Sequence, residues 1–383
     1  MEELFMNPTQ ALTAQTDEEK LATVPDYGWF VMLMSYVRRR LPTMNDFCVI
    51  CDRPHVFASG NMLKPAVCSR ELCCWSFQQL GVGADAAEDI ATEAEVVDLL
   101  VCMTVFAVKN TSRRNLIFDP YPLVFDPNNK SIKLLDPEKK DFNKVEQLLN
   151  LLPSVEKMTQ AKDFGSLKKA MDDKSPHCFP LLQWIISSNR SHIVQINESN
   201  FIKSMNTRHQ YLLLSAPPEK ELKFRELKKT YGSVFAFHGS SIENWHSILR
   251  RGLVNASGTS LQVNGAAYGS GIYLSPHAQT SFGYSRIGYN YNQNQKPTTV
   301  NNGNRFLSSQ NVSCIAICEV INNAIRKSGS IWVQPSEDHV VTRFFFVYET
   351  GEVGNAMQCN TENQPFVKEI TDAMDYYKGK SQQ

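Results

Sequence analysis

The chain has 383 residues, with 39 basic and 39 acidic side chains and a formal charge of zero. This length indicates two or three domains and is sufficient to bury a hydrophobic core. Because the charge is balanced and the basic runs are short, a protein built mainly to bind phosphate backbones is disfavoured, and nucleic acid is not expected as a partner.

Two features bear on the compartment. The most apolar stretch, residues 96–108, is too short to span a membrane and contains Asp98, so a buried helix is predicted there. The first twenty residues lack the basic start and apolar core of a secretory signal. We therefore expect an intracellular, cytoplasmic protein, with attachment to the nuclear envelope or endoplasmic reticulum left open.

The first half of the chain is predicted to be mainly helical after a loose start at residues 1–25. Helical patterns occupy residues 26–41, 83–108, 144–173 and 176–189. Residues 110–145 contain several prolines and polar turns, which favour irregular structure with short strands. This half divides into a helix and cysteine-rich segment at 26–80 and a mainly helical region at 81–204.

Four cysteines of that segment form two close pairs, Cys48 with Cys51 and Cys68 with Cys73. Two pairs of thiolates are typical of a tetrahedral zinc site, although the second pair is wider than a standard knuckle and His55 is an alternative ligand. Two other interpretations stay open. The thiols can be reduced and packed as small apolar groups, or they can accept a modification of the chain itself.

The pattern changes near residue 205, where short strands begin to dominate. Strands are predicted at residues 209–216, 233–237, 271–275, 312–320, 330–333 and 340–349. Helices are predicted at 217–232 and 240–252 and after Pro276. The sequence thus predicts an α+β domain at 205–375, with a polar loop at 288–306 and a tail at 376–383.

The helix at 240–252 has complete start and stop signals. Ser240 and Glu243 have the spacing of a capping box, and Gly252 marks the end. Arg250 and Arg251 lie where the helix dipole favours cations, and they are interpreted as a solvated helix end.

A candidate binding site begins where the strand at 233–237 ends in His238. Gly239 has no side chain, so a ligand can approach its backbone closely. The Ser240 hydroxyl can bond the same planar amide ligand or can cap the helix that follows. Together these residues indicate a pocket for a flat, polar ring.

A second stretch, "YGSGIYLS" at 268–275, supports this interpretation. Its glycines allow a tight turn into a strand, and alternation points Tyr273 away from the core side of Ile272 and Leu274. Tyr273 and Tyr284 flanking one slot would sandwich a flat ring, because stacking on an aromatic side chain stabilises a bound base by about 1–3 kcal/mol. The alternative is that both tyrosines are ordinary half-buried packing residues.

Three blocks carry a resemblance to a known family: "FHGSSIENWHSILRRGL", "YGSGIYLS" and "SFGYS". In this order and at this spacing they resemble the signature blocks of the poly(ADP-ribose) polymerase-like ADP-ribosyltransferases. The cysteine segment and "TRFFFVYE" resemble the cysteine-rich mono-acting branch, family members six and eight. The resemblance implies a diphtheria-toxin-like fold of two packed antiparallel sheets with short helices, and NAD as the co-substrate.

The resemblance also implies roles for single residues. His238 would bond the NAD adenosine ribose, Gly239 and Ser240 would hold the nicotinamide carboxamide with Ser281, and Tyr273 and Tyr284 would stack on the nicotinamide. The remaining predicted NAD-binding residues are Tyr268 and Gly271.

Polymer-forming members of the family place a glutamate on a late strand. Here the matching position is Phe344, with a range of one residue on either side, and neither Arg343 nor Phe345 is acidic. Glu349, five residues on, points to the opposite face of the strand. We therefore list His238, Tyr273 and the non-acidic Phe344 as the catalytic positions.

A phenylalanine cannot act as a general base, and such help is typically worth about 10²–10⁴-fold in rate. The sequence therefore predicts a protein mono-ADP-ribosyltransferase that modifies acceptor proteins, itself among them. The alternative is a weakly active or inactive scaffold that binds NAD or ADP-ribose. A zinc-knuckle nucleic-acid binder is disfavoured by the neutral charge.

Overall fold

The computed structural model describes residues 28–41, 47–48, 50–53, 76, 94–129, 131–161, 164–189, 193–214, 216, 218–262, 267–285, 312–348 and 353–380. The predicted loose start at 1–25 and polar loop at 288–306 lie outside these residues, as do Cys68, Cys73, His55 and Glu349.

Where it is described, the first half contains helices and one short hairpin. Its elements are α2 (Trp29–Arg40), α5 (Ala94–Lys109), α6 (Arg114–Ile117), β1 (Val124–Phe125), β2 (Lys133–Leu135), α7 (Phe142–Leu151), α8 (Val155–Thr159), α9 (Phe164–Asp172) and α10 (Cys178–Ser187). The predicted helix at 144–173 is three helices, because the chain leaves helical geometry at Leu152 just before Pro153. The apolar stretch at 96–108 lies inside α5, whose residues are largely buried, which confirms that prediction.

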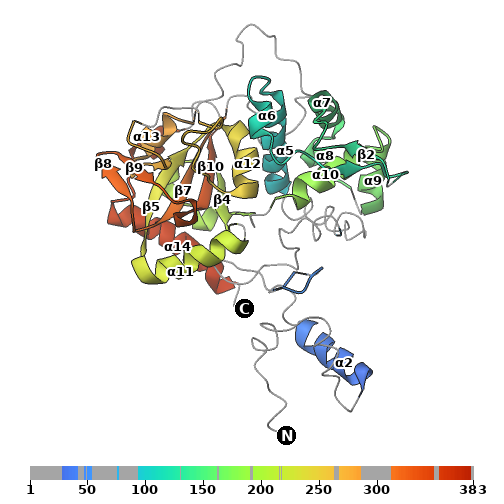
Figure 1. The fold of residues 1–383 in the computed structure, drawn as a ribbon, viewed down its shortest axis with the longest axis horizontal. Coiled ribbons are helices and arrows are strands. Elements are labelled where there is room, and N and C mark those ends of the chain that lie inside the picture. Colours follow the sequence, from blue (N-terminus) through green and yellow to red (C-terminus); the bar gives the residue numbers. More distant parts are fainter. Residues whose placement is uncertain are drawn as a thin grey trace.

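The second half contains two antiparallel sheets, seen on the left of Figure 1. The larger has the order β3-β4-β10-β7-β5, with β3 (Ile193–Gln195), β4 (His209–Leu213), β10 (Val340–Tyr348), β7 (Ser313–Ile321) and β5 (Ser233–Gly239). The smaller has the order β6-β9-β8, with β6 (Ile272–Leu274), β9 (Ile331–Gln334) and β8 (Arg326–Ser328). The α+β class is confirmed, and of these strands only β3 and β8 fall outside the predicted ones.

The two sheets are joined at the end of β5. The backbone N–H of Phe237 donates to the Ser275 carbonyl at 2.7 Å, and the Ser275 N–H donates back to Phe237 at 2.9 Å. This bridge fixes the end of β5 beside the end of β6, so two sequence segments about 35 residues apart meet at one place.

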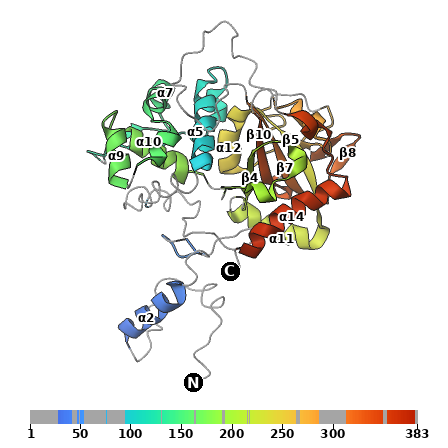
Figure 2. The ribbon, with the colours of Figure 1, turned by 180° about the vertical axis from the view of Figure 1, so that it is seen from behind.

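The helices of the second half are α11 (Pro218–Tyr231), α12 (Trp245–Arg251), α13 (Ala278–Phe282) and α14 (Gln364–Lys380), with short 3-10 turns η2 (Glu198–Asn200), η3 (Lys203–Met205), η4 (Ile242–Asn244), η5 (Glu337–His339) and η6 (Gly354–Gln358). Figure 2 shows α14 and α11 crossing in front of the sheet. The inner residues of α14 share a core with α13 and one face of β10 and β7. α14 was not among the predicted helices, and it runs through residue 376, where a tail was predicted.

One hydrophobic core unites the helical region with the other face of the large sheet. It contains Leu99 and Val105 of α5 together with Trp245 of α12, Ala316 of β7 and Phe345 of β10. Figure 1 shows α5 and α12 side by side between the sheet and the group formed by α7, α8, α9 and α10. The core and the large sheet both continue across the boundary predicted at 204/205, since β3 precedes it and pairs with β4.

The interpretation of Arg250 as a solvated helix end is wrong. Its side chain is fully buried and donates hydrogen bonds to the carbonyls of His246 and Ile185 at 2.9 and 3.0 Å and to the Ser188 hydroxyl at 2.9 Å. Burial lowers the pKa of Arg250 to about 9. Because Ile185 and Ser188 belong to the end of α10, Arg250 ties α12 to the helical region; only Arg251, half-exposed and paired with Asp119, has a surface position.

Candidate active site

His238 and Tyr273 come together where β5 and β6 meet. The Nδ1–H of His238 donates to the Tyr273 carbonyl at 2.9 Å. Burial lowers the pKa of His238, and the bond to Tyr273 opposes this only in part, so the imidazole is neutral at neutral pH. With the proton on Nδ1, the other ring nitrogen, Nε2, is left as an acceptor, which is the state needed to receive a hydroxyl proton from a ligand.

The phenol of Tyr273 is held by the turn that precedes its own strand. Its O–H donates to the Gly269 carbonyl at 2.9 Å, and its oxygen accepts from the Tyr268 N–H at 3.0 Å. Ile272 and Leu274 are buried while Tyr273 is half-buried, so the predicted alternation is confirmed. Gly271 has a φ of 152° and leaves no room for a Cβ beside Val333, so the glycine is needed for the turn to close.

Gly239 packs directly against the backbone of α13. A Cβ built on it would be 1.7 Å from the Ser281 carbonyl oxygen. This glycine was predicted to allow close approach by a ligand, and in the structure it also permits the close approach of α13. The contact brings Ser281, buried in α13, beside the end of β5. Tyr284 follows one turn later with its side chain 47% exposed, and Tyr268 is 49% exposed.

We expect Gly239→Ala to lower the free energy of unfolding by about 1–3 kcal/mol, the usual cost of overpacking. The added methyl group meets the backbone of α13, which has to shift. Urea unfolding measures the loss. Gly283→Ala is the control, since Gly283 has an ordinary φ of −57° and its added Cβ comes no nearer than 3.1 Å to an atom of the chain. Equal losses for the two variants would contradict this explanation of Gly239.

The predicted capping box at Ser240 is wrong. The N-terminal cap of η4 is Ser241, with no side-chain capping bond, because the helix begins one residue later than predicted. The Ser240 hydroxyl instead accepts from the Asn244 amide at 2.9 Å. Its oxygen is thus already an acceptor, which leaves the hydroxyl proton to donate to a ligand.

Trp245 contacts several of these residues and was not among the predicted site residues. Its Nε1–H donates to the Ser240 carbonyl at 3.2 Å, and its ring lies edge-on to His238 with centroids 6.1 Å apart. On its other side it meets Phe345, at a centroid distance of 4.6 Å. A buried tryptophan normally satisfies its N–H, but the partner of that N–H could not be read from the sequence.

Phe344 does not face His238. It is fully buried in the row Phe237–Ile317–Phe344, on the face of the sheet that α13 and α14 cover. His238 pairs with Ala316, which pairs with Phe345, so Phe345 shares the face of His238. The register shift between Thr342 and Phe344 is a bulge, and such a one-residue change is not visible in the sequence. Phe345 falls within the one-residue range left open and is also non-acidic.

The zinc prediction concerns residues that the structure describes only in part. Cys48 and Cys51 lie in one tight turn, where the Cys48 N–H donates to the Arg53 carbonyl and the Asp52 N–H donates to Cys48, both at 2.9 Å. Within the described part of the chain, no group of three or more His, Cys, Asp or Glu side chains is placed to hold a metal ion.

Among the described residues, no helix is long and apolar enough to cross a membrane.

Residues 197–342 match the sequence profile of the poly(ADP-ribose) polymerase catalytic domain. This part of the chain is therefore similar to the poly(ADP-ribose) polymerase catalytic domain, as the three sequence blocks indicated.

Two curated proteins are similar to nearly the whole chain. Human protein mono-ADP-ribosyltransferase PARP8 is 47% identical over 96% of this chain and 44% of its own length, and the mouse protein is 49% identical over 93% and 43%. Human protein mono-ADP-ribosyltransferase PARP16 is 24% identical over 63% of this chain and 67% of its own length. The chain thus spans less than half the length of the PARP8 proteins that it matches.

Proposed function

We propose that this chain transfers a single ADP-ribose unit from NAD to protein side chains and releases nicotinamide. The observation that carries the proposal is the junction of β5 and β6, where His238 bonds Tyr273 beside Gly239 in a region similar to the poly(ADP-ribose) polymerase catalytic domain. The names of PARP8 and PARP16 support the same activity.

In this proposal the site residues mainly hold the dinucleotide. The neutral His238 offers Nε2 to a ribose hydroxyl, Gly239, Ser240 and Ser281 hold the carboxamide, and Tyr273 and Tyr284 enclose the nicotinamide ring, with Tyr268 and Gly271 shaping the turn. Cleavage of the nicotinamide–ribose bond develops oxocarbenium character at the sugar carbon, much as in glycoside cleavage. Orientation for attack on the far face of that carbon lowers the barrier.

The apolar third position supports single transfer. Phe344 and Phe345 are both fully buried phenylalanines, so neither can deprotonate the hydroxyl of an incoming sugar. Without general-base help, worth about 10²–10⁴-fold, attack by a sugar hydroxyl is disfavoured. A carboxylate or thiolate of an acceptor protein is nucleophilic without such help and can still react.

Incubation with NAD labelled in its adenosine part tests the proposal. We expect label to join protein as single ADP-ribose units, which mass spectrometry distinguishes from chains by the added mass. Chains of ADP-ribose would contradict single transfer. Measurable NAD binding without any label on protein would contradict the enzyme and favour the alternative, a scaffold that binds NAD or ADP-ribose.

Four further predictions belong to this proposal. The two antiparallel sheets joined at Ser275 support a diphtheria-toxin-like fold. The turn that holds Cys48 and Cys51 supports a zinc site, which metal analysis of the protein would test. A cytoplasmic location and modification of the chain itself stay predictions from the sequence.

A further inference from the structure

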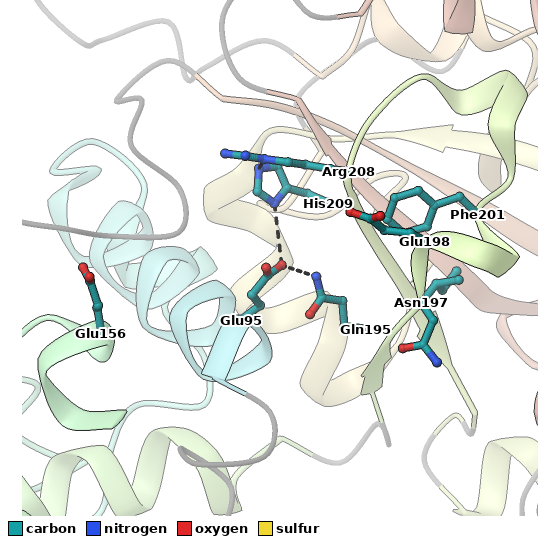
Figure 3. Close-up of a pocket in the computed structure, with 9 residues that line it drawn as sticks. Glu95, Glu156, Gln195, Asn197, Glu198, Phe201, Arg208 and His209 are labelled. Atoms are coloured by element: carbon teal, nitrogen blue, oxygen red, sulfur yellow. Dashed lines mark hydrogen bonds and ion pairs between the residues drawn. The ribbon is translucent and has the colours of Figure 1, made fainter. Parts of the chain in front are cut away.

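A cleft of about 610 Å³ opens at the edge of the large sheet, away from the predicted NAD-binding residues. Figure 3 shows the side chains around it. Glu95 comes from α5 and Glu156 from α8, both in the helical region. Glu198, Arg208 and His209 come from β4 and the turns before it. The cleft thus lies where the helical region meets the sheet.

The cleft lies on the same face of the sheet as His238. His209 begins β4, two residues before Tyr211, which continues the row of His238, Ala316 and Phe345. Even spacing places His209 and Tyr211 on one face. Three strand spacings separate β4 from β5, or about 14 Å. A ligand in the cleft therefore does not occupy the predicted nicotinamide site.

The charged side chains that line the cleft favour a cation. Three are carboxylates, Glu95, Glu156 and Glu198, and one is the guanidinium of Arg208, which leaves a surplus of two negative charges when His209 is neutral. One of these carboxylates, Glu95, also acts on the neighbouring Tyr211. Burial raises the pKa of Tyr211 well above the usual value, and the carboxylates of Glu95 and Asp98 raise it further.

His209 is a buried wall residue whose hydrogen bonding is incomplete within the described part of the chain. Its side chain is 2% exposed, and Nε2 accepts from the Arg208 Nε–H at 3.3 Å, so the proton of the neutral ring is on Nδ1. Nδ1 has no hydrogen-bond acceptor there, and the nearest carboxylate oxygen, on Glu95, is 3.8 Å away. Because buried polar groups are normally hydrogen-bonded, this N–H indicates that a bound group supplies the missing acceptor.

Glu95 has capacity for a further donor. The Gln195 side-chain amide donates to one of its oxygens, and dashed lines in Figure 3 mark this bond and the longer approach of His209. A carboxylate has about four acceptor sites, and the Glu95 side chain is 24% exposed. Phe201 lines the same cleft and offers a ring on which an aliphatic stem can lie.

We propose that this cleft binds a peptide segment that carries lysine or arginine. The ammonium or guanidinium group donates to Glu95 and Glu198, and a peptide carbonyl accepts the otherwise unsatisfied N–H of His209. The side-chain amides of Gln195 and Asn197 line the same cleft and match the donors and acceptors of a peptide backbone. The partner is thus a protein with an exposed basic segment.

Fluorescence anisotropy without NAD tests this, so the result does not depend on the proposed transferase activity. The probe is a labelled peptide, Gly-Gly-Arg-Lys-Gly-Gly, compared with one that has norleucine at both basic positions. We expect saturable binding of the basic peptide only. Glu95→Gln and Glu198→Gln should each weaken it about tenfold, the effect of losing one charge-assisted hydrogen bond.

Glu138→Gln is the matched control, because Glu138 is exposed on the turn after β2 and does not line the cleft. It should leave the dissociation constant unchanged. Thermal unfolding of each variant confirms that the fold is intact. Equal binding of the norleucine peptide, or unchanged binding by Glu95→Gln, would overturn the proposal. So would binding of spermidine or Mn²⁺ that requires Glu95 when the basic peptide does not bind.

Discussion

Tyr273→Ala should reduce transfer of ADP-ribose from NAD by about 100-fold or more. The phenol makes two hydrogen bonds, to Gly269 and Tyr268, and its half-buried ring is the proposed stacking surface. Loss of stacking costs about 1–3 kcal/mol, and each lost hydrogen bond costs about 1 kcal/mol. Each 1.4 kcal/mol is tenfold, so the combined loss exceeds two orders of magnitude. Single-turnover labelling with excess enzyme gives the rate.

Tyr273→Phe separates the ring from its hydroxyl. The ring remains for stacking, while the turn at 268–269 loses the two bonds that hold it. Two lost hydrogen bonds cost about 2 kcal/mol, so we expect an intermediate loss of about 30-fold, mainly in NAD affinity. If Tyr273→Phe were as inactive as Tyr273→Ala, the hydroxyl itself would have a chemical role. If Tyr273→Ala retained full rate, the assignment of this tyrosine to the site would fail.

Arg343→Met should lower the free energy of unfolding by about 3–5 kcal/mol, the usual cost of breaking a buried ion pair from one side. Arg343 is buried in β10 and forms a bidentate ion pair with Glu221 of α11, with nitrogen–oxygen distances of 3.0 and 3.1 Å. It also donates to Glu319 of β7 at 2.8 Å. Removing the guanidinium leaves two buried carboxylates. The urea midpoint and slope give the change.

The pKa of Glu319 supports the size of this effect. Burial alone would raise it, but the charges of Arg343 and Lys228 outweigh burial and lower the pKa to about 2. A lowered carboxyl pKa means that this contribution to stability is complete above the unfolded value near 4.5 and is lost as the pH falls toward 2. Acid should therefore destabilise the wild-type protein through this group, and Arg343→Met should weaken that dependence.

Lys223→Met is the control for charge removal. Lys223 pairs with Asp338 at 3.2 Å, but its side chain is 62% exposed, and surface pairs contribute about 0–1 kcal/mol. It should change the free energy of unfolding little. A loss for Arg343→Met no larger than that of Lys223→Met would show that the buried network does not stabilise the fold as argued.

Much of the site could be predicted because its residues lie in short, strongly patterned segments. His238 ends an apolar strand, and Tyr273 alternates with two core residues, so their local geometry follows from sequence periodicity. The same holds for α5, an apolar run too long for a strand. Gly239 was identified as a position of close approach, but the object that approaches it in the structure is α13, which tertiary packing alone determines.

The errors share a physical cause: each depends on contacts between distant residues. Arg250 looked like a helix end because its acceptors, Ser188 and Ile185, are about 60 residues away. Phe344 was placed by the family resemblance with a range of one residue, and a bulge puts it on the face opposite to His238. His209 gave no local signal at all, since Glu95 meets it only through the packing of α5 against the sheet.

The core shared by the helical region and the large sheet also limits how this protein can be dissected. A fragment starting at residue 205 would lack β3 and would lose α5, which with α12 covers one face of the sheet. Residues 94–380 contain every strand of both sheets together with the helices that share their cores. Swaps of the catalytic region between relatives should exchange this stretch as a unit.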